Sequence, residues 1–224
     1  MTYKGTKKVE IPYMVDNMID GNTLIVGEVV AADQISSTIL DKDIGNVTTT
    51  DIRSRPDDGW LNTNTNWKHI LGDYITQDYD KYDNIIAISI FEHFGLIWDS
   101  KNMSDLTTNL DIINWNHDLR AIEKSCKLLK SENSRVIITL PVGPYMNYND
   151  DGYPILRYYN RQRQNMIRDI INKNNCKLTN EVFYYSQNFE DWSFVGEEIN
   201  DHQYYPAINP NSPNCIWAFC IQLV

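Results

Sequence analysis

The chain has 224 residues, of which 42% are hydrophobic and 22% are charged, and its formal net charge is −10. These proportions are those of an ordinary globular protein, and the length favours one domain over residues 1–224 with a substantial core. The acidic balance argues against a nucleic-acid partner, because neutralising phosphates requires clustered Lys and Arg.

Two further classes of protein are disfavoured by the sequence. No apolar stretch approaches the roughly 18–20 residues that span a bilayer, and the first residues lack the apolar core of a signal peptide. We therefore expect no membrane association and a cytoplasmic location. The cysteines have no CxxC spacing, so we expect them to be reduced and buried rather than bound to zinc or to each other; they are Cys126, Cys176, Cys215 and Cys220.

The first part of the chain has the pattern of a strand, a glycine and a helix. The lead-in, residues 1–22, contains Pro12, which we expect in the first turn of a short helix ending near residue 21. Residues 23–26 then form a short apolar strand that stops at Gly27, and residues 29–40 carry an amphipathic helical pattern. This order is typical of the start of a βαβ unit.

The most apolar segment of the chain is residues 84–90, an almost unbroken run of strand length. Such a run favours a strand covered on both faces, as in a parallel sheet. It stops at Glu92 and His93, and Gly95 follows. Ionisable side chains at the carboxyl end of a buried strand lie where open α/β sheets bind ligands, so this is the first candidate site.

The remaining pattern completes an α/β fold with a largely parallel sheet. Apart from those above, strands are expected over residues 47–52, 69–71, 135–140, 178–185 and 215–224, and helices over residues 118–130 and 158–173. Loops are expected over residues 54–67 and 145–153, the second lid-like by composition, and residues 99–109 are expected to be a loop or a frayed helix. Residues 186–213 are expected to be mostly irregular.

Three short motifs occur in a recognisable order: EIPY at residues 10–13, IFEHFGL at residues 90–96 and TLPVG at residues 139–143. Together they resemble motifs of the class I S-adenosylmethionine-dependent methyltransferases, in particular of the group often found with polysaccharide-modifying enzymes. The resemblance covers roughly residues 10–145. It implies a Rossmann-like, seven-stranded, mostly parallel sheet with helices on both faces and an antiparallel C-terminal strand.

The resemblance also implies a cofactor, S-adenosyl-L-methionine, and positions that bind it. Gly27 matches the first glycine of the turn that approaches the methionine moiety, with Glu28 beside it. Asp51 matches the acidic residue that holds the ribose hydroxyls, with Ile52 or Arg53 beside the adenine.

The other implied positions follow the third and fourth strands. Gly72 and Asp73 match a pair that reaches the adenine amino group, with Tyr74 or Ile75 as its apolar flank. The segment from Ser89 to His93, which includes Phe91 and Glu92, would line the mouth where the methyl group is transferred. His93 is a chemically reasonable base for a methyl acceptor, and Glu92 is its neighbour.

The first glycine motif departs from the family pattern, since Ile25, Val29 and Ala31 replace an acidic residue and two glycines. Glu28 could replace the acidic contact. Two functions therefore stay open: methyl transfer to a small-molecule or glycan acceptor, or a catalytically inactive methyltransferase-fold protein that binds or scaffolds. An open pocket at Gly27 and Asp51 would count against the second. A nicotinamide-dependent oxidoreductase is a poor third reading because GxGxxG is absent after the first strand.

Some of the candidate residues could have a purely structural role instead. Asp51 and Asp73 could cap turns, and Glu92 with His93 could simply shape the loop after the strand. His69, His117 and His202 have no mutual spacing typical of a metal site.

Two other groups of side chains have alternative roles. Five tyrosines could form an aromatic wall for an acceptor or cover a sheet edge: Tyr145, Tyr148, Tyr153, Tyr158 and Tyr159. Four arginines are expected on a solvated helix face, with anion binding as the alternative: Arg157, Arg161, Arg163 and Arg168.

Overall fold

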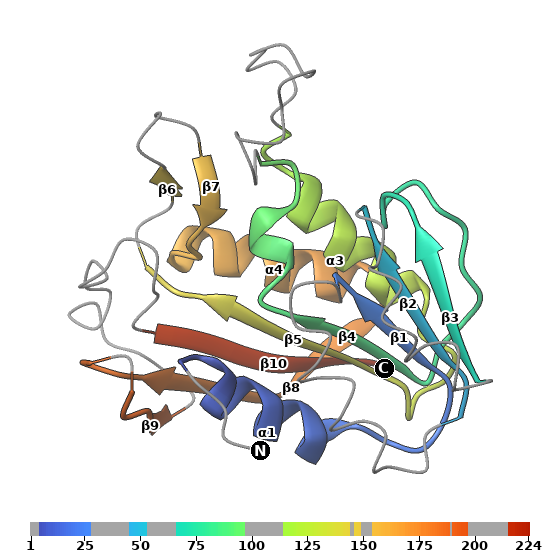
Figure 1. Cartoon of the computed structure of the whole chain (residues 1–224), viewed down its shortest axis with the longest axis horizontal. Coiled ribbons are helices and arrows are strands. Elements are labelled where there is room, and N and C mark those ends of the chain that lie inside the picture. Colours follow the sequence, from blue (N-terminus) through green and yellow to red (C-terminus); the bar gives the residue numbers. More distant parts are fainter. Residues whose placement is uncertain are drawn as a thin grey trace.

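In the part of the chain that the structure describes, eight strands form the main sheet, in the order β3-β2-β1-β4-β5-β10-β8-β9 (Figure 1). The computed structural model describes residues 5–27, 45–52, 66–96, 114–143, 146–148, 154–188, 190–196 and 215–224. The sheet strands are β1 Thr23–Val26, β2 Val47–Asp51, β3 Trp67–Leu71, β4 Asn84–Ile88, β5 Arg135–Pro141, β8 Cys176–Tyr185, β9 Ser193–Gly196 and β10 Cys215–Leu223. The helices are α1 Lys7–Asn17, α3 His117–Lys127, α4 Arg161–Lys173 and the 3-10 helix η3 Phe91–His93, and β6 Met146–Tyr148 pairs with β7 Pro154–Arg157.

The strand directions confirm the predicted α/β class. Strands β3, β2, β1, β4 and β5 run parallel to one another, while β10 lies antiparallel between β5 and β8. Strands β1 and β4 are buried along their whole length, as their apolar composition predicts. The described residues contain eight sheet strands where seven were expected, because β9 falls within the stretch expected to be irregular and pairs with the outer edge of β8.

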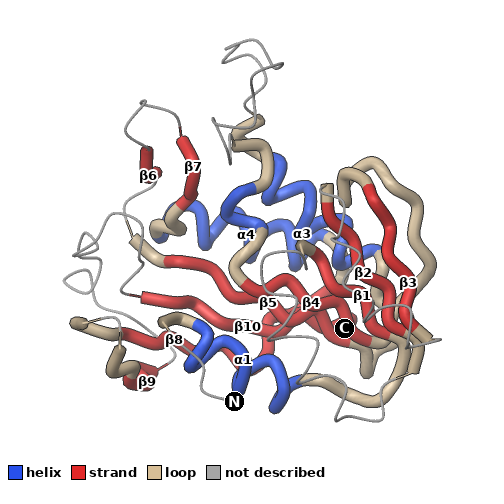
Figure 2. Tube along the Cα trace, in the orientation of Figure 1, coloured by secondary structure: helices blue, strands red, loops and turns tan. Residues whose placement is uncertain are grey.

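Helices cover both faces of the sheet (Figure 2). On one face α1 buries Ile11 and Met14 against Ile25 of β1 and Ile86 of β4. On the other face α3 and α4 pack over the sheet, with Trp217 of β10 in that core. No helix in the described part of the chain has the length and apolarity that crossing a bilayer requires.

Several local expectations are corrected. Helix α1 begins at Lys7 and ends at Asn17, so Pro12 lies in its interior rather than in its first turn. Part of the expected lid-like loop is strand β6, because it pairs with β7 further along the chain. The expected helix over residues 29–40 and the loop over residues 99–109 lie outside the described residues.

The prediction that the four arginines lie on a solvated helix face is wrong for Arg157 and Arg163, because both side chains are buried. Arg163 forms an ion pair with the fully buried Asp118 of α3, and Arg157 of β7 lies 3.5 Å from the same carboxylate. Tyr159 donates its hydroxyl hydrogen to Asp118 over 3.0 Å. This Asp118 cluster joins α3, α4 and β7, so a tertiary ion pair overrides the exposure that the composition suggested.

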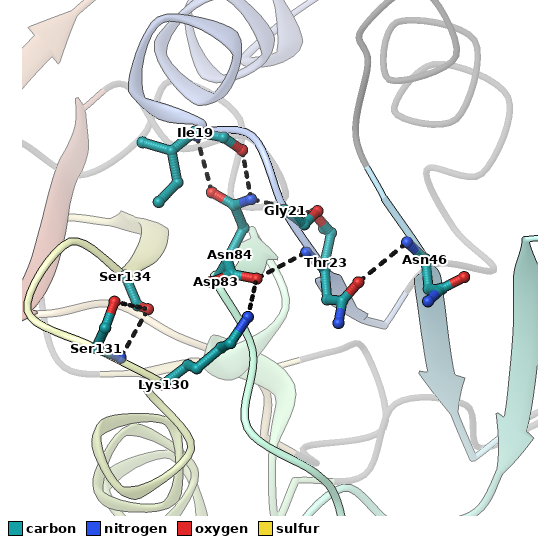
Figure 3. A network of polar contacts seen from close by, with 10 residues as sticks. Ile19, Gly21, Thr23, Asn46, Asp83, Asn84, Lys130, Ser131 and Ser134 are labelled. Atoms are coloured by element: carbon teal, nitrogen blue, oxygen red, sulfur yellow. Dashed lines mark hydrogen bonds and ion pairs between the residues drawn. The ribbon is translucent and has the colours of Figure 1, made fainter.

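The amino ends of β1 and β4 are tied together by side-chain amides and carboxylates (Figure 3). Asn84 accepts a hydrogen bond from the backbone N–H of Ile19 (3.0 Å) and donates to the carbonyl of Ile19 (2.7 Å) and the hydroxyl of Thr23 (3.2 Å). Asp83 accepts from the N–H of Asn22 at 2.9 Å. These bonds fix the end of the sheet opposite to the candidate site.

Candidate functional site

A pocket lies beyond the carboxyl ends of β1, β2, β3 and β4. This is where an open parallel sheet leaves a crevice, because the connections that follow the strands diverge there. The pocket is lined by Val26, Gly27, Thr50, Asp51, Ile52, Gly72, Asp73, Tyr74, Ile90, His93, Phe94, Gly95, Leu96 and His117.

Gly27 forms the turn at the end of β1, in a conformation and at a contact that favour glycine. Its φ is +72°, in the left-handed region that L side chains avoid. A Cβ atom at Gly27 would lie 2.0 Å from Cγ1 of Ile90, so the backbone is in direct contact with that side chain. The glycine predicted to matter therefore lies in the pocket wall, packed under the segment that follows β4.

Asp51 ends β2 and lies in the pocket wall with 6% of its surface exposed. Its carbonyl accepts the N–H of Gly72 over 2.9 Å, which holds the ends of β2 and β3 together. Asp73 follows, and its Oδ1 accepts the N–H of Ile75 at 2.9 Å. Asp73 therefore does both things that the sequence allowed: it caps its own turn, and it lines the pocket.

The turn after β4 supplies the side of the pocket that faces Gly27. His93 lies in this turn, and its Nδ1 is 2.8 Å from the carbonyl oxygen of Ile155 in β7. A carbonyl only accepts hydrogen bonds, so Nδ1 carries the ring hydrogen and Nε2 is the basic nitrogen of the neutral ring. The ring orientation is therefore set by β7, a strand far away in the sequence.

Two buried carboxyl groups lie on the α1 side of this turn. Burial raises the pKa of Glu92 to about 8, and the nearby Glu10 carboxylate adds to the increase. Burial also acts on Glu10, but the Lys7 ammonium and hydrogen bonds from two hydroxyl groups outweigh it and lower the pKa of Glu10. At neutral pH the pair therefore holds one proton on Glu92 and a negative charge on Glu10. Glu92 Oε1 is 3.9 Å from His93 Nε2.

Three of the predicted residues lie outside the pocket wall. Phe91 is fully buried behind it, with its ring centroid 6.0 Å from that of Tyr74 and 5.2 Å from that of Phe94. Glu92 is buried beside Glu10, and the hydroxyl of Ser89 donates to Glu10. The chain turns after β4 so that Ile90 and His93 line the pocket while Ser89, Phe91 and Glu92 do not. The structure brings together Gly27, Asp51, Ile52, Gly72, Asp73, Tyr74, Ile90 and His93. Of the two alternatives for the apolar flank, Tyr74 lines the pocket and Ile75 does not. Glu28 and Arg53 lie outside the described residues.

Sequence reasoning missed several residues of the pocket. The sequence predicts no role for His117, because its spacing from the other histidines does not fit a metal site, yet it lies in the wall, where burial lowers the pKa of its ring. It reaches the site because Gly95 contacts the chain before α3: a Cβ at Gly95 would lie 2.2 Å from the carbonyl of Asn114. No local signal in the sequence indicated this contact. Phe94, Gly95 and Leu96 could have been found from their place in the 90–96 motif.

Glu10 belongs to the EIPY motif, for which the sequence predicts no role, and the structure places it next to the site. Its Oε1 accepts hydrogen bonds from Ser89 and Thr139, and its Oε2 accepts from Lys7 at 2.9 Å. All four residues come from elements that meet at the carboxyl ends of β4 and β5. The residue was missed because its partners are far away in the sequence.

The fold is similar to that of known methyltransferases. No family model matches the sequence, and no curated protein matches it. The 1,6-didemethyltoxoflavin-N1-methyltransferase of Burkholderia thailandensis, solved with its substrate and S-adenosylhomocysteine, superposes with a TM-score of 0.57 at 9% identity, over 91% of this chain and 71% of that one. The N-methyltransferase NodS of Bradyrhizobium japonicum gives 0.56 at 8% identity, over 95% and 92%.

An O-methyltransferase of neocarzinostatin biosynthesis, NcsB1, solved with S-adenosylmethionine and a naphthoic acid, gives a TM-score of 0.55 at 8% identity. The match covers 97% of this chain and 54% of that one. With the strand order and the reversed β10, these likenesses assign the chain the class I S-adenosylmethionine-dependent methyltransferase fold, which confirms the fold that the motifs predicted.

Proposed function

We propose that this protein transfers a methyl group from S-adenosyl-L-methionine to an oxygen or nitrogen of a small-molecule or glycan acceptor. The observation that carries the proposal is the pocket at the carboxyl ends of the parallel strands, which gathers Gly27, Asp51 and Asp73 from three different strand ends. These residues are the ones that the family resemblance assigns to the cofactor. Their convergence on one crevice supports a common ligand.

The chemistry of the wall suits this cofactor. Asp51 offers a carboxylate that can accept two hydrogen bonds from a cis-diol, as a ribose presents. Ile52, Tyr74 and Leu96 offer apolar surface for a flat base. Bound S-adenosylmethionine supplies an electrophilic methyl group on a positively charged sulfur, and the carboxylates of the wall favour a cation. The residues present therefore fit the group.

His93 is the proposed base. With Nδ1 donating to the carbonyl of Ile155, Nε2 can take a proton from an acceptor hydroxyl or amine in the pocket. An in-line displacement needs little more from the protein than this proton transfer and a fixed orientation of the acceptor. The hydrogen bond to β7 provides the orientation of the ring.

Glu92 is the proposed partner of the base. Its Oε1 lies 3.9 Å from His93 Nε2, so a small movement of either side chain brings the two into hydrogen-bond contact. When Nε2 becomes protonated, an ionised Glu92 stabilises the imidazolium. Because the pKa of Glu92 is raised to about 8, this support increases as the pH rises through that value.

Calorimetry with S-adenosylmethionine and S-adenosylhomocysteine tests the proposal. We expect both to bind, and Asp51→Ala to weaken binding by about tenfold to hundredfold, since the ribose loses a charged hydrogen-bond acceptor. Asp169→Ala removes the same charge from an exposed position of α4 and serves as the matched control. Absence of binding at millimolar ligand contradicts the proposal.

The alternative is a methyltransferase-fold protein that binds or scaffolds without catalysis, suggested by Val29 and Ala31 in place of glycines. The pocket at Gly27 and Asp51 favours the enzyme over this alternative. Binding of S-adenosylhomocysteine without methyl transfer to any acceptor in a panel of sugars, hydroxyarenes and amines would favour the alternative.

A further inference from the structure

The end of β4 is held by a closed set of hydrogen bonds around one strained residue. Ser89 has a φ of +48°, in the left-handed region, although it is not a glycine. Its N–H lies 3.1 Å from Oγ1 of Thr139 in β5, and its hydroxyl donates to Oε1 of Glu10 in α1. The hydroxyl of Thr139 donates to the same Glu10 oxygen over 2.6 Å.

Glu10 is built to accept these hydrogen bonds. Its side chain is fully buried, and Oε2 is paired with Lys7 at 2.9 Å. An ionised carboxylate has no hydrogen to donate, so both of its oxygens can accept at once. The lowered pKa of Glu10 is consistent with this state.

The strained residue stands at the point where the chain leaves the sheet for the pocket. Ile90 follows directly, and its side chain lies over Gly27. His93 comes three residues later, in the same turn. A left-handed residue in a non-glycine position persists only where its surroundings hold it. A change in φ at Ser89 would rotate the entire turn and displace both Ile90 and His93.

We propose that Glu10 is a positioning residue of the site: it holds Ser89 in the left-handed conformation and so places Ile90 against Gly27 and His93 beside the pocket. The role of the N-terminal helix α1 is then to deliver this carboxylate to the end of β4. The inference rests on the proposed function, since a positioning residue requires a site that binds a ligand.

A rescue experiment tests it, with the affinity for S-adenosylhomocysteine as the readout. We expect Glu10→Ala to weaken binding by at least about tenfold, because the hydroxyls of Ser89 and Thr139 both lose the acceptor that fixes them at this bend of the backbone. Adding Ser89→Gly should restore the affinity to within about threefold of the Ser89→Gly single variant, because glycine adopts positive φ without help. Glu10→Gln, which keeps an oxygen for the two hydroxyls, should lie within about threefold of the wild type.

Tyr13→Phe is the matched control on the same helix. It removes the hydrogen bond from Tyr13 to the carbonyl of Asn180 (2.7 Å), which ties α1 to β8 away from the pocket. If the loss of affinity in Glu10→Ala does not come from a general loosening of α1, Tyr13→Phe should bind S-adenosylhomocysteine as tightly as the wild type. Full binding by Glu10→Ala, failure of Ser89→Gly to restore the double variant, or equal loss in Tyr13→Phe overturns the proposal.

A second readout separates this inference from the proposed function. The ¹⁵N shifts of the His93 ring report its hydrogen bond to Ile155 without any ligand. They should change in Glu10→Ala and return in the double variant with Ser89→Gly. If the wild type does not bind S-adenosylhomocysteine, the proposed function fails, while unchanged ring shifts in Glu10→Ala would overturn the positioning role itself.

Discussion

The two ends of the central strands are built in opposite ways. At the amino end, the side chain of Asn84 makes hydrogen bonds with both its oxygen and its nitrogen, and Asp83 binds both Asn22 and Lys130. At the carboxyl end, Ser89 is held in a left-handed conformation, and Glu92 Oε2 is buried with no hydrogen-bond partner among the described residues. The paired end stabilises the sheet, and the strained end lies next to the pocket, which is where proteins commonly keep strain and shifted pKa values.

The largest expected effect comes from breaking the paired end. Asn84→Leu should lower the free energy of unfolding by about 4 kcal/mol, because Ile19 and Thr23 lose their buried hydrogen-bond partner. Urea denaturation measures this, and the affinity of the folded protein for S-adenosylhomocysteine should not change. Asn172→Leu on the exposed face of α4 is the control, expected within about 0.5 kcal/mol. If Asn84→Leu were as stable as the wild type but bound S-adenosylhomocysteine more weakly, the amino end would serve binding rather than stability, contrary to this prediction.

At the strained end, Gly27→Ala should cost about 3 kcal/mol of unfolding free energy and also reduce binding of S-adenosylhomocysteine. The new Cβ would collide with Ile90, and the alanine backbone would have to adopt a positive φ. Ile90→Ala relieves the collision but not the backbone strain, so a double-mutant cycle should give a favourable coupling of about 1 kcal/mol. Strict additivity of the two changes would show that the predicted contact is absent.

The raised pKa of Glu92, about 8 against an ordinary value of 4.5, predicts a pH-dependent stability. The folded protein keeps the proton up to about pH 8 while the unfolded chain releases it near its ordinary value, so the stabilising contribution is lost as pH rises between the two. Relative to Glu92→Gln, which does not titrate, the wild type should lose about 2 kcal/mol between pH 6 and pH 8. Thermal or urea unfolding of both proteins measures this difference, and parallel pH profiles would mean that Glu92 is ionised in the folded protein.

The smallest effect is expected at the surface of the paired end. Lys130 lies 3.1 Å from Asp83, and its side chain is 52% exposed. Lys130→Met should cost about 0.5 kcal/mol or less, because water and salt screen exposed ion pairs. The same measurement at high salt should reduce the difference further. A loss comparable to that of Asn84→Leu would show that the ion pair, rather than the amide network, holds this end.

Local patterns were sufficient for most of the fold. The apolar run of β4 and the helical stripe of α3 predicted their elements, and the carboxyl ends of β1, β2 and β3 predicted pocket residues such as Gly27, Asp51 and Asp73. Strand β9 and the β6–β7 hairpin were missed because they are only three or four residues long and their pairing is decided by partners elsewhere in the chain.

The site was only partly predictable for the same reason. Periodicity indicates which residues follow a strand but not which way each side chain turns, so Ser89, Phe91 and Glu92 were expected in the pocket and lie outside its wall. His117 lies in the wall through a contact between two loops, and Arg157 is buried through its ion pair with Asp118.

The sequence by itself determined the main strands of the sheet, helices α3 and α4, the family resemblance and the residues at the strand ends, because these depend on patterns within a few residues. The tertiary structure decided which carboxyl group is ionised, how His93 is oriented and why Glu10 matters. Burial, charge and hydrogen bonding depend on neighbours that the sequence separates, such as Glu10 from Ser89 and His93 from Ile155.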